Sequence, residues 1–353
     1  MKTRGMTNRR RIAALDFDSL NPPIRHPAKK FLLTETQGIG GGNHFDKVRL
    51  KKVEIVLGPT GVGKTDFAIK KALEYGSPVI SCDSRQIFKE MTIGTAVPDA
   101  SQLAAVKHYF IHSNSALEDY TAGRYEIEAH RLVKELFEMG HERLVMCGGS
   151  GFYIDAFVNG LDDFPSADQK LRAELTARLQ EEGVGALAGE LRALDPESCE
   201  VIDLSNGQRV LRALEVCLMT GRKFSSFKTS PRRNHDFEIE KIGLMRSKEE
   251  LYSRIDARVL KMIDEGLVEE VRGLIPFRDR PALQTVGYKE IFAWFDYLDG
   301  KVSTEGWGPT TPGDGPVTTL ERAIELIQRN SRRYAKRQLS YWRRDKSIVW
   351  VDL

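Results

Sequence analysis

The sequence predicts an α/β fold, in which a parallel β-sheet is flanked by helices and interrupted by an all-helical insertion. Short β-branched runs alternate with helix-compatible segments, which is typical of parallel sheets with helices on both faces. A glycine-rich loop joins the first of these runs to the first helical segment. After Pro165 the composition shifts to Ala, Leu, Glu and Arg, which indicates a separate helical region.

The elements follow one another in a regular order along the chain. We expect strands at 53–57, 78–82, 143–147 and 238–244, and helices at 64–75, 124–139 and 251–274. Leu171, Leu175 and Leu179 are spaced as one face of a helix inside the insertion. The Pro- and Gly-rich stretch 306–316 predicts a surface loop.

Four regions follow from this order. We expect a flexible extension at 1–47, a first part of the core at 48–163, the helical insertion at 164–237 and a second part of the core with a basic C-terminal helix at 238–353. The extension has little sustained periodicity, and a mis-assigned start codon gives the same pattern.

Composition narrows the class of protein. The chain has 353 residues, of which 41% are hydrophobic and 29% charged, as in a soluble globular protein of about two domains. No apolar run is long enough to span a bilayer, and the basic segment 1–11 lacks the apolar stretch of a secretory signal. We therefore expect a cytoplasmic protein. The four cysteines show no C-x-x-C spacing, which favours reduced thiols over a zinc site or a disulfide framework.

The glycine-rich loop is a candidate phosphate-binding loop (P-loop), as in P-loop NTPase-like sheets. Its residues are Gly58, Pro59, Thr60, Gly61, Val62, Gly63, Lys64 and Thr65. The glycines let backbone N–H groups turn toward an anion, Lys64 adds a positive charge, and the Thr65 hydroxyl can bind Mg²⁺. The strand before and the helix after the loop favour this interpretation over a glycine-rich turn without a ligand. The ligand should be a di- or triphosphate.

Two further strand ends carry polar residues. Asp83-Ser-Arg-Gln86 follows the second strand and Gly148-Gly-Ser-Gly-Phe-Tyr153 follows the third, so both should share the carboxyl edge of the sheet with the P-loop. Enzymes that transfer a γ-phosphate usually have an Asp after an apolar strand to help hold Mg²⁺. The strand 143–147 ends instead in Gly148 and Gly149, which weakens the case for phosphoryl transfer and leaves it open.

A basic stripe lies near the C-terminus. Seven basic residues and no acidic one fall between Arg329 and Arg344. Five of them share one face of a helix, namely Arg329, Arg332, Arg333, Lys336 and Arg337. Such a stripe suits a nucleic-acid backbone, and the alternative is a solvated face paired with acidic residues elsewhere. Tyr334, Tyr341 and Trp342 interleave with it, which is compatible with base stacking and equally with core packing.

Five segments together resemble the tRNA dimethylallyltransferase (tRNA isopentenyltransferase) family, in its bacterial form. They are Gly58–Thr65, Ser81–Pro98, Gly148–Tyr153, Gln284–Lys289 and Arg333–Gln338. They occur in the family's order and cover nearly everything from about residue 50 onward. The agreement of five separate motifs is far more specific than any one of them.

The resemblance implies transfer of the dimethylallyl group of dimethylallyl diphosphate to N6 of the adenosine 3′-adjacent to the anticodon of tRNA, position 37, with Mg²⁺ as cofactor. The P-loop then binds a leaving group, whose growing negative charge the loop amides, Lys64 and Mg²⁺ on Thr65 can stabilise. Asp83 matches the family's general base and Arg258 an arginine at the diphosphate. The adenine amine is a poor nucleophile, so a carboxylate that accepts its proton is chemically reasonable. A buried Asp that caps a helix or binds water near Mg²⁺ is the alternative.

The resemblance also implies a channel that a flipped adenosine enters from one side and the diphosphate from the other. The residues implied at the tRNA are Asp83, Ser84, Arg85, Gln86, Ser150, Arg172, Gln208, Arg209, Val210, Leu211, Arg212, Gln284, Thr285, Val286, Gly287, Tyr288, Lys289, Lys336, Arg337 and Gln338. Phe88 and Ser150 replace the family's usual Tyr and Thr, and Val97 stands where Lys is common. Partners are thus tRNA and dimethylallyl diphosphate, with no membrane, for a chain expected to be a monomer.

Other functions remain open. A kinase of a small metabolite consumes ATP, whereas the preferred reaction releases diphosphate without ATP. An adenylate isopentenyltransferase accepts a free nucleotide, and neither the helical insertion nor the basic stripe is needed for that. A catalytically silent RNA-binding protein retains tRNA and gives no product.

Overall fold

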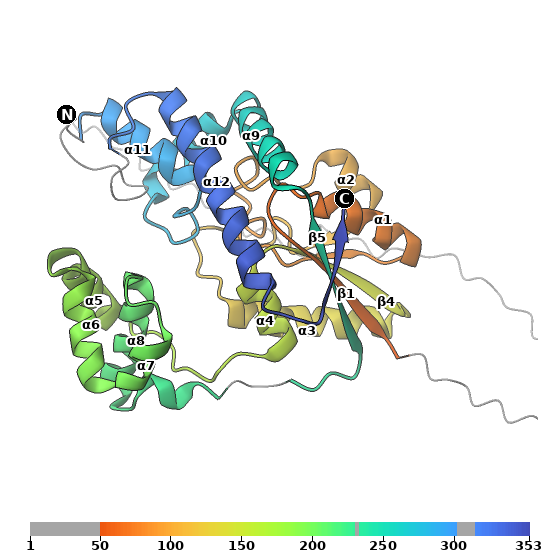
Figure 1. Ribbon diagram of the computed structural model, residues 1–353. Coiled ribbons are helices and arrows are strands. Elements are labelled where there is room, and N and C mark those ends of the chain that lie inside the picture. Colours follow the sequence, from red (N-terminus) through yellow and green to blue (C-terminus); the bar gives the residue numbers. More distant parts are fainter. Residues whose placement is uncertain (1–49, 230–232, 302–314) are drawn as a thin grey trace, which may run out of the picture. The chain divides into compact units, whose positions relative to one another are not determined.

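The computed structural model describes residues 50–229, 233–301 and 315–353 (Figure 1). The expected extension at 1–47 and most of the expected loop at 306–316 lie outside these residues. Within the described part of the chain, no helix combines the length and the apolar character that crossing a membrane requires.

The core is a six-stranded sheet in which all neighbouring strands are parallel, with the order β3-β2-β4-β1-β5-β6. The strands are β1 (Lys52–Leu57), β2 (Val79–Ser81), β3 (His108–Tyr109), β4 (Arg143–Gly148), β5 (Glu238–Met245) and β6 (Ile348–Asp352). The prediction of a parallel sheet is confirmed, as are its four expected strands. The sequence did not predict β3, which has two residues and hence no period, or the short edge strand β6.

Helices connect the strands and cover both faces of the sheet (Figure 1). Those of the core are α1 (Lys64–Tyr75), α2 (Ala100–Ala105), α3 (Ala122–Glu138), α4 (Gly151–Asn159), α9 (Lys248–Asp264), α10 (Leu267–Gly273), the 3-10 helix η3 (Ile275–Phe277), α11 (Tyr288–Leu298) and α12 (Leu320–Trp342). The single helix predicted at 251–274 is wrong. Gly266 has a φ of 98° and separates α9 from α10, because a left-handed residue cannot continue a right-handed helix.

Alternate residues of β1 pack against different helices. Val53, Ile55 and Leu57 lie in one apolar cluster with residues of α3 and α4. Val56 lies in another with residues of α1 and α9, and with Ala335 of α12. Successive side chains of a strand point to opposite faces of its sheet, so both faces are buried. This explains why β1 reads as an almost continuous apolar run.

The segment between the two parts of the core is helical, as predicted. It contains α5 (Gln169–Glu181), α6 (Gly183–Leu194), α7 (Pro196–Val201), α8 (Gly207–Thr220) and the 3-10 helix η2 (Phe224–Phe227). Leu175 is buried in an apolar cluster of its own with residues of α6 and α8, and Leu171 and Leu179 pack against that cluster. The predicted leucine face of α5 is confirmed, and the insertion has a separate core.

Candidate active site

The P-loop connects β1 to α1 in the conformation that its glycines predict. Gly61 has a φ of 84°, and an added Cβ there would lie 2.8 Å from Cγ1 of Ile255. At Gly58 an added Cβ would lie 2.7 Å from the carbonyl oxygen of Leu244. Both the backbone conformation and the close packing therefore require glycine.

The backbone amides of this loop are available to a ligand. Within the described residues, the N–H groups of Gly61, Gly63 and Lys64 have no hydrogen-bond acceptor. The first N–H groups of a helix have no partner within the helix, and together with the helix dipole they favour a bound anion. The Thr65 hydroxyl also makes no hydrogen bond to a described residue, so it is free to bind a metal ion that accompanies a diphosphate.

Two arginines hold the outer side of the loop. Nε of Arg254 donates to the carbonyl oxygen of Gly61 at 2.9 Å. Nε of Arg246 donates to that of Val62, also at 2.9 Å. These bonds satisfy two carbonyl groups of the loop and help to fix its backbone. The sequence reasoning missed both arginines, although Arg254 lies four residues before Arg258 on the same helix and could have been found by that spacing.

The cations at this loop are poorly compensated within the protein. Burial lowers the pKa of Lys64, whose Nζ donates to the carbonyl oxygen of Pro59 at 2.9 Å. Burial also lowers the pKa of Arg258, and the neighbouring Arg254 lowers it further. Because a buried cation is favourable only with an opposite charge, the site is suited to a multivalent anion.

Asp83 directly follows β2, at the same edge of the sheet. Its Oδ1 accepts the N–H groups of Arg85 at 2.9 Å and Gln86 at 3.3 Å, which holds the carboxylate in a tight turn. No described residue donates a hydrogen bond to Oδ2. No helix begins at Asp83, so Oδ1 stabilises a turn and not the helix cap of the alternative, while Oδ2 is free to accept a proton.

Ser150 joins the Asp83 turn to the end of β4. Its Oγ accepts the Ser84 N–H at 2.9 Å and donates to Oγ of Ser84 at 3.0 Å. The order of the sheet explains this contact, because β1, β4 and β2 are neighbours and their carboxyl ends adjoin. The prediction that the P-loop, the Asp83 segment and the Gly148 segment share one edge is confirmed.

A family model described as IPP transferase matches residues 86–345. The chain belongs to the IPP transferase family. Relatives support this assignment: tRNA dimethylallyltransferase 2 of Porphyromonas gingivalis is 46% identical over 296 residues, which cover 84% of this chain and 92% of the relative. The tRNA dimethylallyltransferase of Christiangramia forsetii is 45% identical over 297 residues, with the same shares covered, 84% and 92%.

Solved structures agree with this family. The tRNA isopentenylpyrophosphate transferase of Bacillus halodurans aligns with a TM-score of 0.58 and 34% identity, over 86% of this chain and 90% of that one. A eukaryotic dimethylallyltransferase acting on tRNA aligns with a TM-score of 0.67 and 24% identity, over 86% of this chain and 74% of that one, which supports the fold alone. The family resemblance inferred from the five motifs is confirmed.

In this IPP transferase family member, Gln338 connects α12 to the reaction site. Its Oε1 accepts the Thr60 N–H at 2.8 Å, and its Nε2 donates to the Gly149 carbonyl oxygen at 2.8 Å. The Gln338 side chain is buried. This corrects the expectation that it contacts tRNA, because its amide is already used to join the P-loop to the end of β4.

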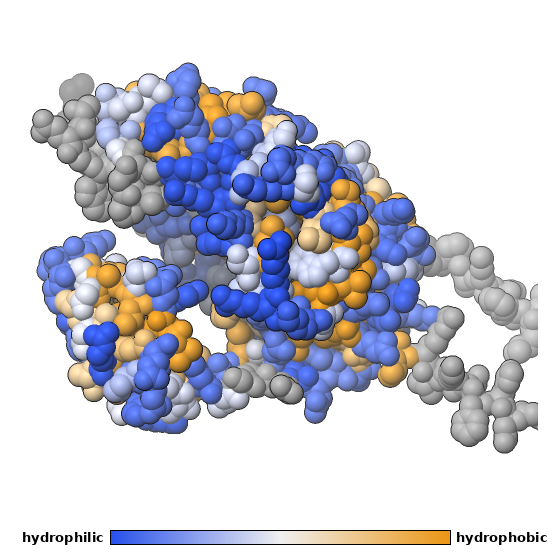
Figure 2. Space-filling view, viewed as in Figure 1, coloured by the Kyte–Doolittle hydropathy of each residue, from blue (hydrophilic) through white to orange (hydrophobic). Residues whose placement is uncertain are grey.

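The basic stripe on α12 is partly neutralised. The Arg332 guanidinium pairs with Asp256 of α9, so the alternative of an acidic partner holds at this position. Arg333, Lys336 and Arg337 are exposed, and no carboxylate of the described residues pairs with them. Figure 2 shows hydrophilic side chains gathered along α12. The stripe therefore keeps three cations for a polyanion.

In the helical insertion, the structure separates the expected tRNA residues into two sets. Gln208 and Arg209 are exposed at the start of α8, whereas Val210 and Leu211 are buried in the core of the insertion. Burial corrects the expectation that the side chains of Val210 and Leu211 reach tRNA. Their spacing from Leu214 on α8 could have revealed an apolar face.

Arg172 and Arg212 have a shared partner in the insertion. Both guanidinium groups donate to Oε2 of the fully buried Glu215, each at 2.6 Å, and Arg212 also donates to the carbonyl oxygen of Pro165 at 2.6 Å. A buried carboxylate needs such partners. Both arginines therefore have a structural role in the insertion, and their expected contact with tRNA stays a prediction.

The segment 284–289 is similarly divided. Tyr288 is fully buried and its hydroxyl donates to Glu270 at 2.6 Å, which corrects the expectation that it contacts tRNA. The N–H of Gly287 donates to the buried Glu290 at 2.8 Å. Exposed or half-buried positions remain at Gln284, Thr285, Val286 and Lys289.

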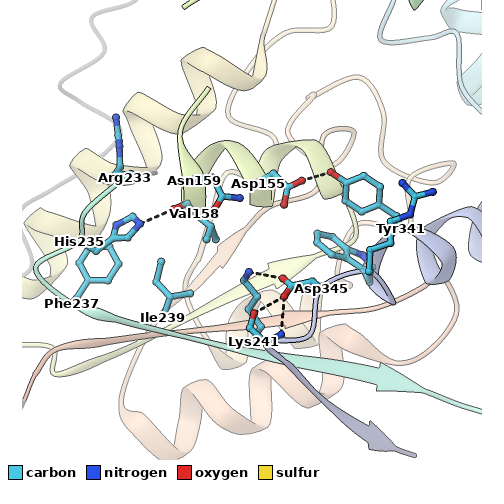
Figure 3. A pocket seen from close by; sticks show the side chains of 13 residues that line it. Asp155, Val158, Asn159, Arg233, His235, Phe237, Ile239, Lys241, Tyr341 and Asp345 are labelled. Atoms are coloured by element: carbon cyan, nitrogen blue, oxygen red, sulfur yellow. Dashed lines mark hydrogen bonds and ion pairs between the residues drawn. The ribbon is translucent and has the colours of Figure 1, made fainter. Parts of the chain in front are cut away.

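A large groove of about 920 Å³ lies beside α4 and is separate from this site (Figure 3). Figure 3 shows the Tyr341 hydroxyl directed toward Asp155, and Lys241 toward Asp345. Neither the P-loop nor the Asp83 turn lines it. The groove therefore lacks both the anion-binding amides and the free carboxylate, and we do not assign the reaction to it.

Proposed function

We propose that this chain transfers the dimethylallyl group of dimethylallyl diphosphate to N6 of the adenosine 3′-adjacent to the anticodon of tRNA. The products are N6-dimethylallyladenosine at position 37 and diphosphate. The names of the curated relatives at 46% and 45% identity support this activity.

One observation carries the proposal. An anion cradle with two buried cations, Lys64 and Arg258, adjoins a strand end where a carboxylate has a free oxygen. The cradle suits the diphosphate leaving group, and the carboxylate suits the proton of the attacking amine. The neighbouring strand β4 ends in glycines, so it offers no acid of the kind that phosphoryl transfer uses.

In the proposed mechanism, the bond between the allylic C1 and the diphosphate oxygen breaks while the bond between N6 and C1 forms. The free Oδ2 of Asp83 accepts the proton that N6 loses. Lys64, Arg258 and the loop amides stabilise the negative charge that moves onto the diphosphate. Thr65 and the bound diphosphate would hold Mg²⁺, which supplies further charge stabilisation when bound.

We assign tRNA recognition to the exposed and half-buried polar residues around this site. Those in the core are the half-buried Ser84, Arg85 and Lys289 and the exposed Gln284, Arg333, Lys336 and Arg337, and we add the exposed Gln208 and Arg209 of the insertion. Cationic side chains supply backbone contacts whose strength depends on salt. The helical insertion at 164–237 adds exposed basic residues that suit the anticodon arm. We propose that it acts in the cytoplasm, which suits a tRNA substrate, and that it acts as a monomer.

The test is an assay with labelled dimethylallyl diphosphate, Mg²⁺ and either unmodified tRNA or AMP. We expect label in tRNA at the adenosine next to the anticodon, and no requirement for ATP. Label in AMP alone would establish the adenylate-specific alternative, and tRNA retention without product the silent binding protein. Turnover that depends on ATP would establish the kinase. Light scattering on the purified protein measures the oligomeric state.

A further inference from the structure

Tyr334 lies in a row of α12 residues that faces the protein interior. Asn330, Tyr334, Gln338 and Trp342 are spaced four apart, which puts them along one side of the helix. Nδ2 of Asn330 donates to the buried Glu290 at 2.8 Å, and Trp342 is buried in the core. Tyr334 differs from these neighbours, because 37% of it is exposed and its hydroxyl makes no hydrogen bond to a described residue.

The surroundings of Tyr334 belong to the reaction site. Gln338, one turn further along, is bonded to Thr60 of the P-loop and to Gly149 at the end of β4. The charged groups that act on the Tyr334 phenol are Asp83, Arg85 and Arg337. The Arg337 guanidinium lies 5.8 Å from the Tyr334 ring centroid, on one side of the ring. The other side of the ring has no aromatic or cationic partner among the described residues.

A second tyrosine is influenced by the same charged groups. Asp83 and Arg85 also act on the phenol of Tyr153, in the first turn of α4. The Tyr153 ring stacks on that of Tyr125 with centroids 4.6 Å apart. Burial raises the pKa of Tyr153 to about 12, so its ring is neutral at physiological pH. Tyr153 is thus fixed in the core, whereas the Tyr334 ring is partly exposed.

The other two aromatic residues near the basic stripe are already engaged. Trp342 is buried in the core, and the Tyr341 hydroxyl is bonded to Asp155 at the groove of Figure 3. The sequence left base stacking and core packing open for all three. The structure distinguishes these three residues. Of the three, Tyr334 is the one with an exposed ring on which Asp83 acts.

We propose that Tyr334 is a positioning residue, whose ring stacks on the flipped target adenine and holds its N6 at Asp83. This inference rests on the proposed function. Stacking on an aromatic ring accepts any base with a π-face and is lost when the ring is replaced by an aliphatic side chain. Tyr334→Leu should therefore raise the KM for tRNA roughly tenfold or more, the range of one lost stacking contact. The KM for dimethylallyl diphosphate should stay unchanged, because Tyr334 makes no hydrogen bond to the P-loop among the described residues.

The test combines kinetics with a binding probe that cannot react. An anticodon stem-loop with 2-aminopurine in place of the target adenosine lacks the N6 amine, and its fluorescence is quenched when the base stacks on an aromatic ring. With wild-type protein we expect a quenched signal, and with Tyr334→Leu a bright one. Tyr334→Phe should keep both the quenching and the KM for tRNA, since the ring is retained. Tyr341→Leu, on the same helix, is the control and should leave the 2-aminopurine signal quenched.

Each outcome decides the proposal. A KM for tRNA and a fluorescence signal in Tyr334→Leu equal to those of the wild type would overturn it. A loss in Tyr334→Phe as large as that in Tyr334→Leu would assign the effect to the hydroxyl and also overturn it. If Tyr334→Leu fails to fold, Tyr334→Trp replaces it, and its larger ring should deepen the quenching. Wild-type protein that quenches the probe yet transfers no dimethylallyl group would refute the proposed reaction and leave the stacking supported.

Discussion

The Gln338 side chain offers a measurable test of how α12 supports the reaction site. Gln338→Ala removes the acceptor of the Thr60 N–H and the donor to the Gly149 oxygen, two bonds of 2.8 Å each. A buried polar group without a partner costs about 1–3 kcal/mol. Thr60 is half-buried, so water replaces part of that bond. We expect a loss of roughly 2–4 kcal/mol in the free energy of unfolding, which lowers the Tm of a chain of this length by about 3–5 °C.

The assay has two parts. Thermal and urea unfolding of Gln338→Ala measure the stability loss, and titration with diphosphate and Mg²⁺ measures the affinity of the P-loop. We expect the affinity to fall as well, because Thr60 belongs to the loop whose amides bind the anion. Affinity for tRNA, measured with the stem-loop alone, should change little, since the Gln338 amide is not available to RNA.

Gln328→Ala is the matched control. Gln328 is the same residue type on the same helix, and its Nε2 makes one longer bond of 3.3 Å, to the carbonyl oxygen of Asp256. It should lose less than about 1 kcal/mol. A Gln338→Ala protein as stable as this control, with unchanged diphosphate affinity, would refute the reasoning. Weakened tRNA binding with an intact P-loop would restore Gln338 as an RNA contact.

Three other changes test the site. Asp83→Asn keeps the turn made by Oδ1 and removes the proton acceptor. The single-turnover rate should therefore fall at least about 100-fold, with an unchanged Tm. A rate within a few-fold of the wild-type rate would contradict the role of Asp83 as base. Burial lowers the pKa of Lys64, and a bound diphosphate should raise it. Diphosphate binding should therefore take up protons at pH values between the pKa of free and of bound protein, and the affinity should fall as pH rises through that interval. Calorimetry in two buffers of different ionisation enthalpy measures the proton uptake. Replacing Arg333 and Lys336 with Ala should weaken tRNA binding and reduce its salt slope by about 1–2 while sparing diphosphate affinity. Arg332→Ala is the control, because Asp256 already pairs with it, and an equal effect of both changes would argue against specific phosphate contacts.

The P-loop and the shared sheet edge could be predicted because both depend on local pattern. The glycines of 58–63 encode backbone conformations that other residues avoid, and the run 53–57 encodes a strand buried on both faces. Once the strands are taken as parallel, the residues after each strand must lie at one edge. The position of Asp83 and Ser150 next to the P-loop follows from this rule alone.

The errors arise where contacts join distant parts of the sequence. Gln338 and Thr60 are 278 residues apart, and Arg332 and Asp256 are 76 apart, so no local period reveals either contact. Motif position predicts that Tyr288 contacts tRNA, but motif position carries no information on the burial of its side chain. Its hydroxyl contacts Glu270, and an added Cβ on Gly94 would lie 2.5 Å from its ring, so this tyrosine is fixed in the core.

The end of β4 explains why a P-loop can act here on a leaving group. An added Cβ on Gly148 would lie 2.6 Å from the backbone carbon of Cys82, and one on Gly149 would lie 2.4 Å from Nε2 of Gln338. Neither position has room for the acid that holds Mg²⁺ in phosphoryl transfer. The carboxylate of Asp83 stands one strand further from the loop, after β2. In the proposed mechanism it therefore serves the nucleophile, and the same anion cradle stabilises the departing diphosphate.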